Sequence, residues 1–300
     1  KWGVPVDFDP KHIIYVWIDA LTNYITFIGY DPEGSTEQFK KLWPANLHLI
    51  GKDILRFHTI YCPLLLMALD LPLPEQIFGH PWLLMSNDKM SKSKGNVIYA
   101  DDLVEHFGVD AVRYYLLHEI PFSSDGNITY ELLIERINGD LANVLGNLVQ
   151  RTISMAKKYF NKKVEYKGRK EDLDDELITQ INNLRDKIDE KMKTLEVAES
   201  ISVIFEVLRA SNKYIDETTP WILAKEENKK ERLETVLYHL LESIRVCAIK
   251  LEPFLPSTSQ EILRQLNTED KTEQLNLNNK YELNDPEVLF ARIDKETFLA

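Results

Sequence analysis

The spacing of apolar residues changes near Thr129, and this change limits the folds that the chain can adopt. Apolar residues recur at helical spacing from Tyr130 to Phe160, and further long helical stretches follow with no strand between them. Residues 122–300 are therefore expected to form an all-α helical bundle. The helices expected after Phe160 cover residues 174–195, 197–217, 231–251 and 259–266.

The part before this bundle alternates short strands with helices. Strands are expected at 12–18, at 46–50 and within 76–85, with helices at 20–28 and 53–69 that begin at the caps Asp19 and Asp53. This alternation indicates an α/β fold with a doubly wound, parallel, Rossmann-like sheet, in which ligands bind at the carboxyl ends of the strands. The loop 121–126 is the expected boundary, so residues 1–121 would form a partial nucleotide-binding domain.

Composition narrows the class of protein further. The two cysteines, Cys62 and Cys247, cannot build a disulfide framework or a four-cysteine zinc site, and the run 64–69 is too short to span a bilayer. No signal peptide is visible, so a cytoplasmic protein without membrane association is expected. The formal net charge of −12 argues against non-specific nucleic-acid binding, although local basic patches can still contact RNA.

The stretch 80–97 ends in three lysines, Lys89, Lys92 and Lys94, separated mainly by serine and followed by Gly95. Flexible ammonium groups and small residues suit a mobile loop that closes over a polyphosphate. A solvated basic turn is the alternative interpretation.

The order Lys89-Met-Ser-Lys-Ser93 is similar to the signature loop of class I aminoacyl-tRNA synthetases. Other segments resemble the bacterial-type methionyl-tRNA synthetases and fall in the same order as in that family, from about Trp2 to the end of the chain. These segments are Tyr15-Val-Trp-Ile-Asp-Ala20, His48-Leu-Ile-Gly-Lys-Asp53, Asp140-Leu-Ala-Asn143 with Gly146-Asn147, and Asn212-Lys-Tyr-Ile-Asp-Glu-Thr-Thr-Pro-Trp221.

The resemblance implies a methionine–tRNA ligase that activates methionine with ATP and transfers it to tRNA(Met), with Mg²⁺ as the usual partner of ATP. Lys89 and Lys92 would be the catalytic residues, which stabilise the departing pyrophosphate. The residues implied for ATP binding are Gly51, Asp53, His80, Lys89, Met90, Ser91, Lys92 and Ser93. Pro81 stands where the family usually has glycine.

Two aromatic-lined helical faces could meet at the sheet edge and form a pocket for an apolar side chain, although core packing would explain the same stripes. The resemblance implies that these residues bind methionine: Trp17, Ala20, Tyr24, Ile54, Phe57 and His58. Cys62 stands where the family usually has tryptophan, so a roomier pocket wall is expected.

In the bundle, the resemblance assigns reading of the CAU anticodon to Asn147, Arg151, Pro220 and Trp221. Stacking of a base on tryptophan and hydrogen bonds from arginine and asparagine suit this role. A solvated polar helix face and a buried core tryptophan are the alternatives.

No histidine of this chain lies in the family's His-x-Gly-His motif, so we expect a catalytically incomplete fragment. A missing N-terminal half is then a candidate partner, zinc would belong to that half, and no metal ligand is assigned in this chain. Two other interpretations stay open: a non-catalytic tRNA-binding module, and a related class I synthetase for another apolar amino acid.

Overall fold

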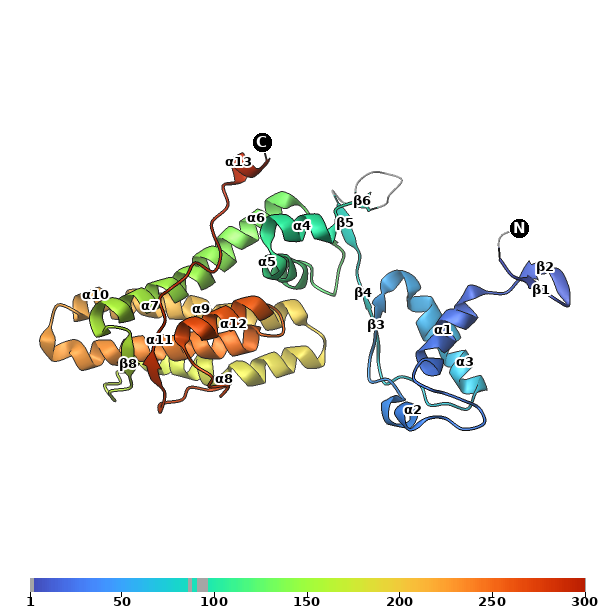
Figure 1. Cartoon of the computed structure of the whole chain (residues 1–300), viewed down its shortest axis with the longest axis horizontal. Helices are drawn as coiled ribbons and strands as arrows, with labels where there is room; N and C mark the ends of the chain where they lie inside the picture. Colours follow the sequence, from blue (N-terminus) through green and yellow to red (C-terminus); the bar gives the residue numbers. More distant parts are fainter. Residues whose placement is uncertain (1–2, 86–87, 91–96, 300) are drawn as a thin grey trace. The chain divides into compact units, whose positions relative to one another are not determined.

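The chain folds into two compact units that meet in sequence at Trp82 and Leu83. This computed structural model describes residues 3–85, 88–90 and 97–299 (Figure 1). The boundary predicted between residues 121 and 122 concerns functional domains rather than these compact units, and it stays a prediction.

The first unit is built around a parallel pair of strands with helices between them. A hairpin of β1 (Pro5–Val6) and β2 (Asp9–Ile13) comes first. The elements that follow are α1 (Val16–Thr26), α2 (Glu37–Leu42), β3 (His48–Gly51), η1 (Lys52–Ile54), η2 (Phe57–Tyr61), α3 (Cys62–Ala68) and β4 (Ile77–His80). Strands β3 and β4 pair in parallel, with His48 opposite Ile77 and Gly51 opposite His80.

The strand predicted at 12–18 is wrong beyond Ile13, because α1 already begins at Val16. The β-branched and aromatic residues there favour a strand locally, but helical spacing lets Leu21 and Ile25 pack into the small core of the unit. Packing therefore overrides propensity. The cap predictions are also wrong: Asp19 lies inside the first turn of α1, and Asp53 lies within η1.

The second unit opens with a small sheet and a helical pair. Strand β5 (Leu83–Met85) lies between β6 (Asp88–Lys89) and β7 (Gly126–Asn127), antiparallel to the first and parallel to the second. Helix α4 (Ala100–Phe107) ends at Gly108, whose φ of 79° suits glycine. Helix α5 (Val109–Tyr114) then runs on into η4 (Tyr115–Glu119).

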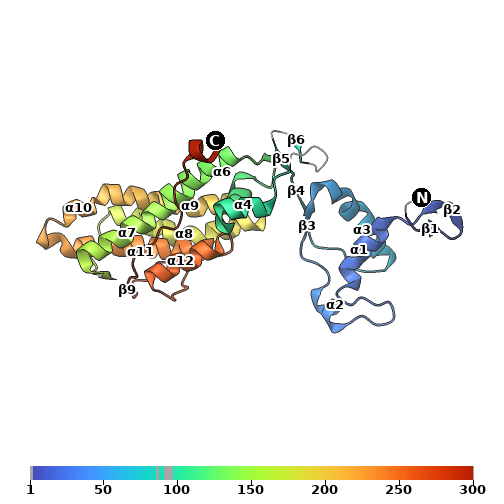
Figure 2. The ribbon, with the colours of Figure 1, turned by 45° about the horizontal axis from the view of Figure 1, so that its top comes forward.

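The rest of the second unit is the predicted helical bundle. One continuous helical run comprises α6 (Tyr130–Arg136), the π-helical η5 (Ile137–Gly146) and α7 (Asn147–Phe160). It is followed by β8 (Lys163–Glu165), α8 (Leu173–Lys193), α9 (Val197–Thr218), α10 (Pro220–Leu223), η6 (Glu227–Lys229), α11 (Lys230–Leu251), α12 (Pro256–Leu266), β9 (Lys280–Glu282) and α13 (Lys295–Leu299). Helices α7, α8, α9 and α11 lie side by side (Figure 2). The expected class, an α/β region followed by an all-α bundle, is confirmed.

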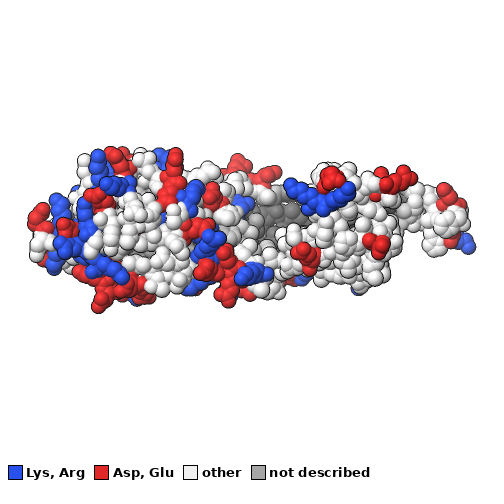
Figure 3. Space-filling view, turned by 90° about the horizontal axis from the view of Figure 1, so that it is seen from below, with Lys and Arg blue, Asp and Glu red and all other residues white. Residues whose placement is uncertain are grey.

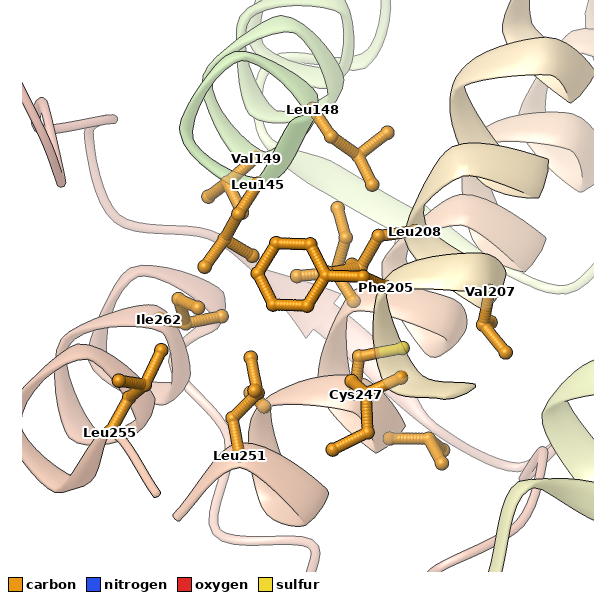
Figure 4. Close-up of a cluster of buried hydrophobic side chains, with 14 of the residues drawn as sticks. Leu145, Leu148, Val149, Phe205, Val207, Leu208, Cys247, Leu251, Leu255 and Ile262 are labelled. Atoms are coloured by element: carbon orange, nitrogen blue, oxygen red, sulfur yellow. The ribbon is translucent and has the colours of Figure 1, made fainter. Parts of the chain in front are cut away.

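Helix α11 is the centre of the bundle, since almost every side chain from Arg232 to Leu251 is buried. The Phe205 ring of α9 packs among side chains from the surrounding helices (Figure 4). A helix buried on all sides is what a bundle core produces. Within the described residues, no helix is both long and apolar enough to cross a membrane.

A fully buried ion pair lies on α11. Arg245 donates from Nη2 and Nε to the two carboxylate oxygens of Glu242, at 2.7 and 3.0 Å, and both side chains are 0% exposed. Arg245 also donates to the carbonyl of Gln274, while Glu242 accepts from the backbone N–H of Asn276 and from the hydroxyl of Tyr281. Burial, then the nearby Glu242 charge, raises the pKa of Tyr281. This network closes the segment 270–281 over the middle of α11.

We predict that Arg245→Met lowers the free energy of unfolding of the bundle by about 3–5 kcal/mol, because Glu242 is then a buried charge without its partner. Arg264→Met is the control. Arg264 forms an exposed pair with Glu261 and Glu287, so its loss should cost less than about 1 kcal/mol. Denaturant unfolding monitored by helical circular dichroism measures both, and equal costs for the two variants would contradict the structural role of the buried pair.

Candidate functional site

The predicted aromatic residues of the first unit do come together. Trp17 of α1 and Phe57 of η2 stack face to face, with ring centroids 4.0 Å apart and planes at 7°. The His58 ring meets Trp17 edge to face at 6.2 Å. Ala20 lies one turn after Trp17 and is exposed. These side chains form a flat aromatic wall between α1 and η2.

Hydrogen bonds on both ring nitrogens hold His58, which is buried. Nδ1 lies 3.0 Å from the carbonyl of Ile54, which can only accept, so Nδ1 carries the proton. In the neutral ring Nε2 is then an acceptor, and the Tyr24 hydroxyl donates to it at 3.0 Å. Burial, with a smaller contribution from Cys62, raises the pKa of Tyr24. The pair is therefore an oriented, hydrogen-bonded unit beside the aromatic wall.

His48 belongs to this cluster, although the sequence analysis did not select it. Its ring stacks on Tyr24 at 4.6 Å, and burial followed by the neighbouring His58 lowers its pKa. In β3, His48 and Ile50 are buried while Leu49 is exposed. Side chains alternate across β3, so His48 shares a face with Ile50, but the apolar Leu49 on the other face left the sequence without a signal of which face is buried.

Three of the residues predicted to bind ATP, Gly51, Asp53 and His80, also lie close together. Gly51 pairs with His80 across the parallel strands, so both lie at the carboxyl edge of the sheet. A Cβ atom on Gly51 would lie 2.6 Å from Oδ1 of Asp53, so a larger residue there would displace the Asp53 carboxylate. Asp53 and His80 are exposed, and His80 Nδ1 bonds to the carbonyl of Pro81 at 2.9 Å. This edge presents polar groups where doubly wound sheets bind ligands.

The structure describes only part of the stretch 80–97, which contains the three lysines. Lys89 lies in β6, and Met90 packs against the core of the second unit. Ser91, Lys92 and Ser93 lie outside the described residues. Their predicted role in binding ATP, and that of Lys89, stays a prediction.

Three of the four predicted reading residues of the bundle lie at the surface, and the fourth, Pro220, is buried. Asn147, the first residue of α7, is exposed, and Arg151 follows one turn later with Nη2 3.6 Å from Asp216 of α9. Pro220 is buried as the first residue of α10, and Trp221 is 42% exposed. The alternative of a buried core tryptophan is therefore excluded.

Two other residues from the quoted motifs have a structural role instead. Asp140 is buried and pairs with Arg209 of α9 at 3.3 Å. The side-chain amide of Asn212 donates to the carbonyl of Val144 in the π-helical η5 at 3.1 Å. These bonds join α9 to the start of α7 and so set Asn147 and Arg151 beside the end of α9.

Comparison with known families gives two matches, which divide the chain between residues 153 and 164. Residues 1–153 match the family described as "tRNA synthetases class I (M)", and residues 164–299 match "Anticodon binding domain of methionyl tRNA ligase". The chain belongs to the methionyl-tRNA synthetase family of class I.

Individual members of the methionyl-tRNA synthetase family are close to this chain in sequence and structure. The methionine–tRNA ligase of Clostridium acetobutylicum is 55% identical over 298 residues, which are 98% of this chain and 46% of that protein. That of Clostridium perfringens is also 55% identical, over 100% of this chain and 47% of its own length. The chain thus spans about half the length of the curated relatives that it matches.

A solved synthetase has the same fold. The methionyl-tRNA synthetase of Mycobacterium tuberculosis, in complex with methionyl-adenylate, superimposes with a TM-score of 0.88 and 38% identity, covering 97% of this chain and 58% of that one.

We predict that the Nδ1–H tautomer of His58 survives in Tyr24→Phe, because its bond to Ile54 is retained, whereas the Nε2 nitrogen signal shifts as its donor is lost. Imidazole ¹⁵N NMR spectra measure both nitrogens. Tyr30→Phe is the control, because the Tyr30 ring packs on Phe39 away from His58. An Nε2–H tautomer in the unmodified chain would contradict the described hydrogen bonds.

Proposed function

We propose that this chain is the carboxyl-terminal part of the catalytic domain, together with the anticodon-binding domain, of a methionine–tRNA ligase. The complete enzyme would activate methionine with ATP and transfer it to tRNA(Met). The observation that carries the proposal is the cluster of Trp17, Tyr24, Phe57 and His58 in one unit that also presents Gly51, Asp53 and His80 at a sheet edge.

In the proposed site, the aromatic wall and the Tyr24–His58 pair bind the methionine side chain. Stacked rings offer a polarisable surface that suits a thioether. Ala20 and Ile54 would complete the pocket. The buried thiol of Cys62, small compared with the tryptophan usual in the family, would leave more room at its far wall.

ATP would bind at the neighbouring edge, with its ribose on Gly51 and Asp53 and with His80 beside it. Lys89 and Lys92 would stabilise the charge that develops on the departing pyrophosphate, because an in-line displacement depends on positioning and electrostatics. Within the described residues no cluster of three His, Cys, Asp or Glu side chains is placed to hold a metal ion. We assign no protein ligand to Mg²⁺, which commonly reaches such sites on the phosphates of the nucleotide.

We infer that the first unit needs a complementary segment. Large apolar side chains are unusually exposed in it, and Ile60, Leu64 and Met67 form an apolar stripe at i, i+4 and i+7 along η2 and α3. The surface of this unit is largely free of charged side chains in the view of Figure 3. Such patches mark surfaces that another segment covers. The proposed partner is the N-terminal half found in the relatives, which would also hold any zinc.

We expect this chain alone to catalyse no methionine-dependent exchange of pyrophosphate into ATP, because the other half of the catalytic domain is needed to close the site. Mixing it with a separately produced N-terminal half of the relatives' length should restore part of the exchange. Exchange by the chain alone at the rate of a complete relative would contradict this part of the proposal.

A non-catalytic tRNA-binding module is the second candidate function, since the bundle carries exposed reading residues of its own. A related class I synthetase for another apolar amino acid would preserve the same sheet edge. The pocket residues Trp17 and His58 favour the methionine enzyme over the module, and their combination with Arg151 and Trp221 favours it over the related synthetase. The proposed location is the cytoplasm, in keeping with the two free cysteines.

Trp221→Ala tests the function of the bundle. If a base stacks on the exposed ring, the substitution should weaken binding of a CAU anticodon stem-loop by about 1–3 kcal/mol. The free energy of unfolding should change by less than about 1 kcal/mol, since the ring is only partly buried. RNA titration and denaturant unfolding of the same variant separate the two effects.

Ile222→Ala is the matched control for Trp221, because Ile222 is equally exposed on α10 but has no aromatic face for a base. Equal losses of RNA affinity in the two variants would refute stacking on Trp221. An unchanged affinity in Trp221→Ala would refute the anticodon assignment.

A further inference from the structure

The surface formed by α7 and α10 contains a basic side chain, Lys158, that is not among the residues assigned to reading the anticodon. Lys158 is exposed near the end of α7, and its Nζ lies 5.1 Å from the centroid of the Tyr159 ring. In the part of the chain that the structure describes, no carboxylate lies within ion-pair distance of it. An exposed ammonium group without an ion-pair partner is available to bind an anionic ligand.

Two lysines near Lys158 in the sequence, in contrast, form ion pairs. Lys157 pairs with Asp285 at 2.7 Å, and Lys162 pairs with the same carboxylate at 2.9 Å. The contrast between Lys157 and Lys158 also supplies a control within one turn of helix.

Lys158 borders a small pocket next to Trp221. The pocket has a volume of about 200 Å³, and α7 and the end of α10 form two of its walls. Glu226 and Glu227 also line it, but they pair with Lys229 and Lys230 at 2.9 and 3.6 Å. Lys158 is therefore the lysine of the pocket lining that pairs with neither carboxylate. The remaining lining residues are Tyr159, Phe160, Leu223, Ala224, Lys230 and Leu233.

Helical spacing connects this pocket with the reading residues. Asn147, Arg151, Ser154 and Lys158 stand at i, i+4, i+7 and i+11 of α7, so they share one face of the helix. Arg151 contacts Asp216, five residues before Trp221, and Lys158 shares a pocket with residues two and three places after Trp221. The two helices thus form one continuous edge, and at its end lies Lys158, which is exposed and for which the described residues provide no ion-pair partner.

We propose that Lys158 binds a backbone phosphate of the tRNA, next to the nucleotide whose base stacks on Trp221. This inference rests on the proposed anticodon-binding function and adds to it a contact that carries no sequence information. A compact ammonium on a flexible stem suits a single phosphate. Phosphate contacts position a nucleic acid, whereas base contacts specify it. Lys158 would hold the anticodon loop in register while Arg151 and Trp221 read it.

The test compares Lys158→Gln with Lys157→Gln in this chain. Binding of a CAU anticodon stem-loop is measured over a range of salt concentrations. Lys158→Gln should weaken binding on the order of fivefold, equally for CAU and for another anticodon. The plot of log K against log salt has a negative slope, and the variant should reduce the magnitude of that slope by about 0.7. Lys157→Gln should change neither quantity. Both lysines lie in the last turn of α7, so the loss of either charge should affect the interaction with the helix dipole to the same extent.

Replacing single phosphates of the loop by neutral methylphosphonates locates the contact. Replacement of the phosphate that Lys158 contacts should weaken binding of the loop to the unmodified chain. The same replacement should not weaken binding to Lys158→Gln any further. A salt slope that is the same in Lys158→Gln as in the unmodified chain would overturn the proposal.

Failure of the proposed function looks different. In that case the unmodified chain binds CAU and other stem-loops equally, whatever the salt slope of the lysine variants. Preference for CAU with an unchanged slope in Lys158→Gln overturns the phosphate contact alone.

Discussion

The bundle depends on one constraint, the burial of α11 together with its Glu242–Arg245 ion pair. A charged pair with no exposed surface is stable only when all of its hydrogen-bonding capacity is used. The segment 270–281 supplies the missing partners through its backbone carbonyls, Asn276 and Tyr281. Helices α7, α9 and α12 pack against the apolar remainder of α11. The helical surfaces that face solvent are therefore placed by an interior network that contacts no ligand.

The proposed reading edge follows from that arrangement. Asn212 and Asp140 tie α9 to the π-helical start of the α7 run, and this leaves Asn147 and Arg151 beside the end of α9. Thr219 takes a left-handed conformation, with φ 43°, and Pro220 begins α10 directly afterwards. The buried proline anchors this short helix, so the neighbouring tryptophan remains at the surface. Motif residues thus divide into buried ones that position and exposed ones that can bind.

Much of this fold was predictable because periodicity over long segments reports burial. The helices from Tyr130 onward were correctly predicted for that reason. The failure at residues 12–18 arose because local β-propensity and tertiary packing disagree there. The Glu242–Arg245 pair could not be foreseen, since residues at i and i+3 on a helix look the same whether exposed or buried. In the site, motif order selected Trp17 and His58, but their contacts and the exposure of Trp221 required the folded chain.

The central claim is that α7 and α10 together form one surface that reads the methionine anticodon. Amide NMR spectra of this chain, titrated with a CAU anticodon stem-loop and then with a loop of another anticodon, test it directly. The account predicts that the largest shift changes fall on the exposed face of α7 and on α10, and that the second loop produces weaker changes at the same residues. Changes centred elsewhere in the bundle, or equal responses to both loops, would contradict it.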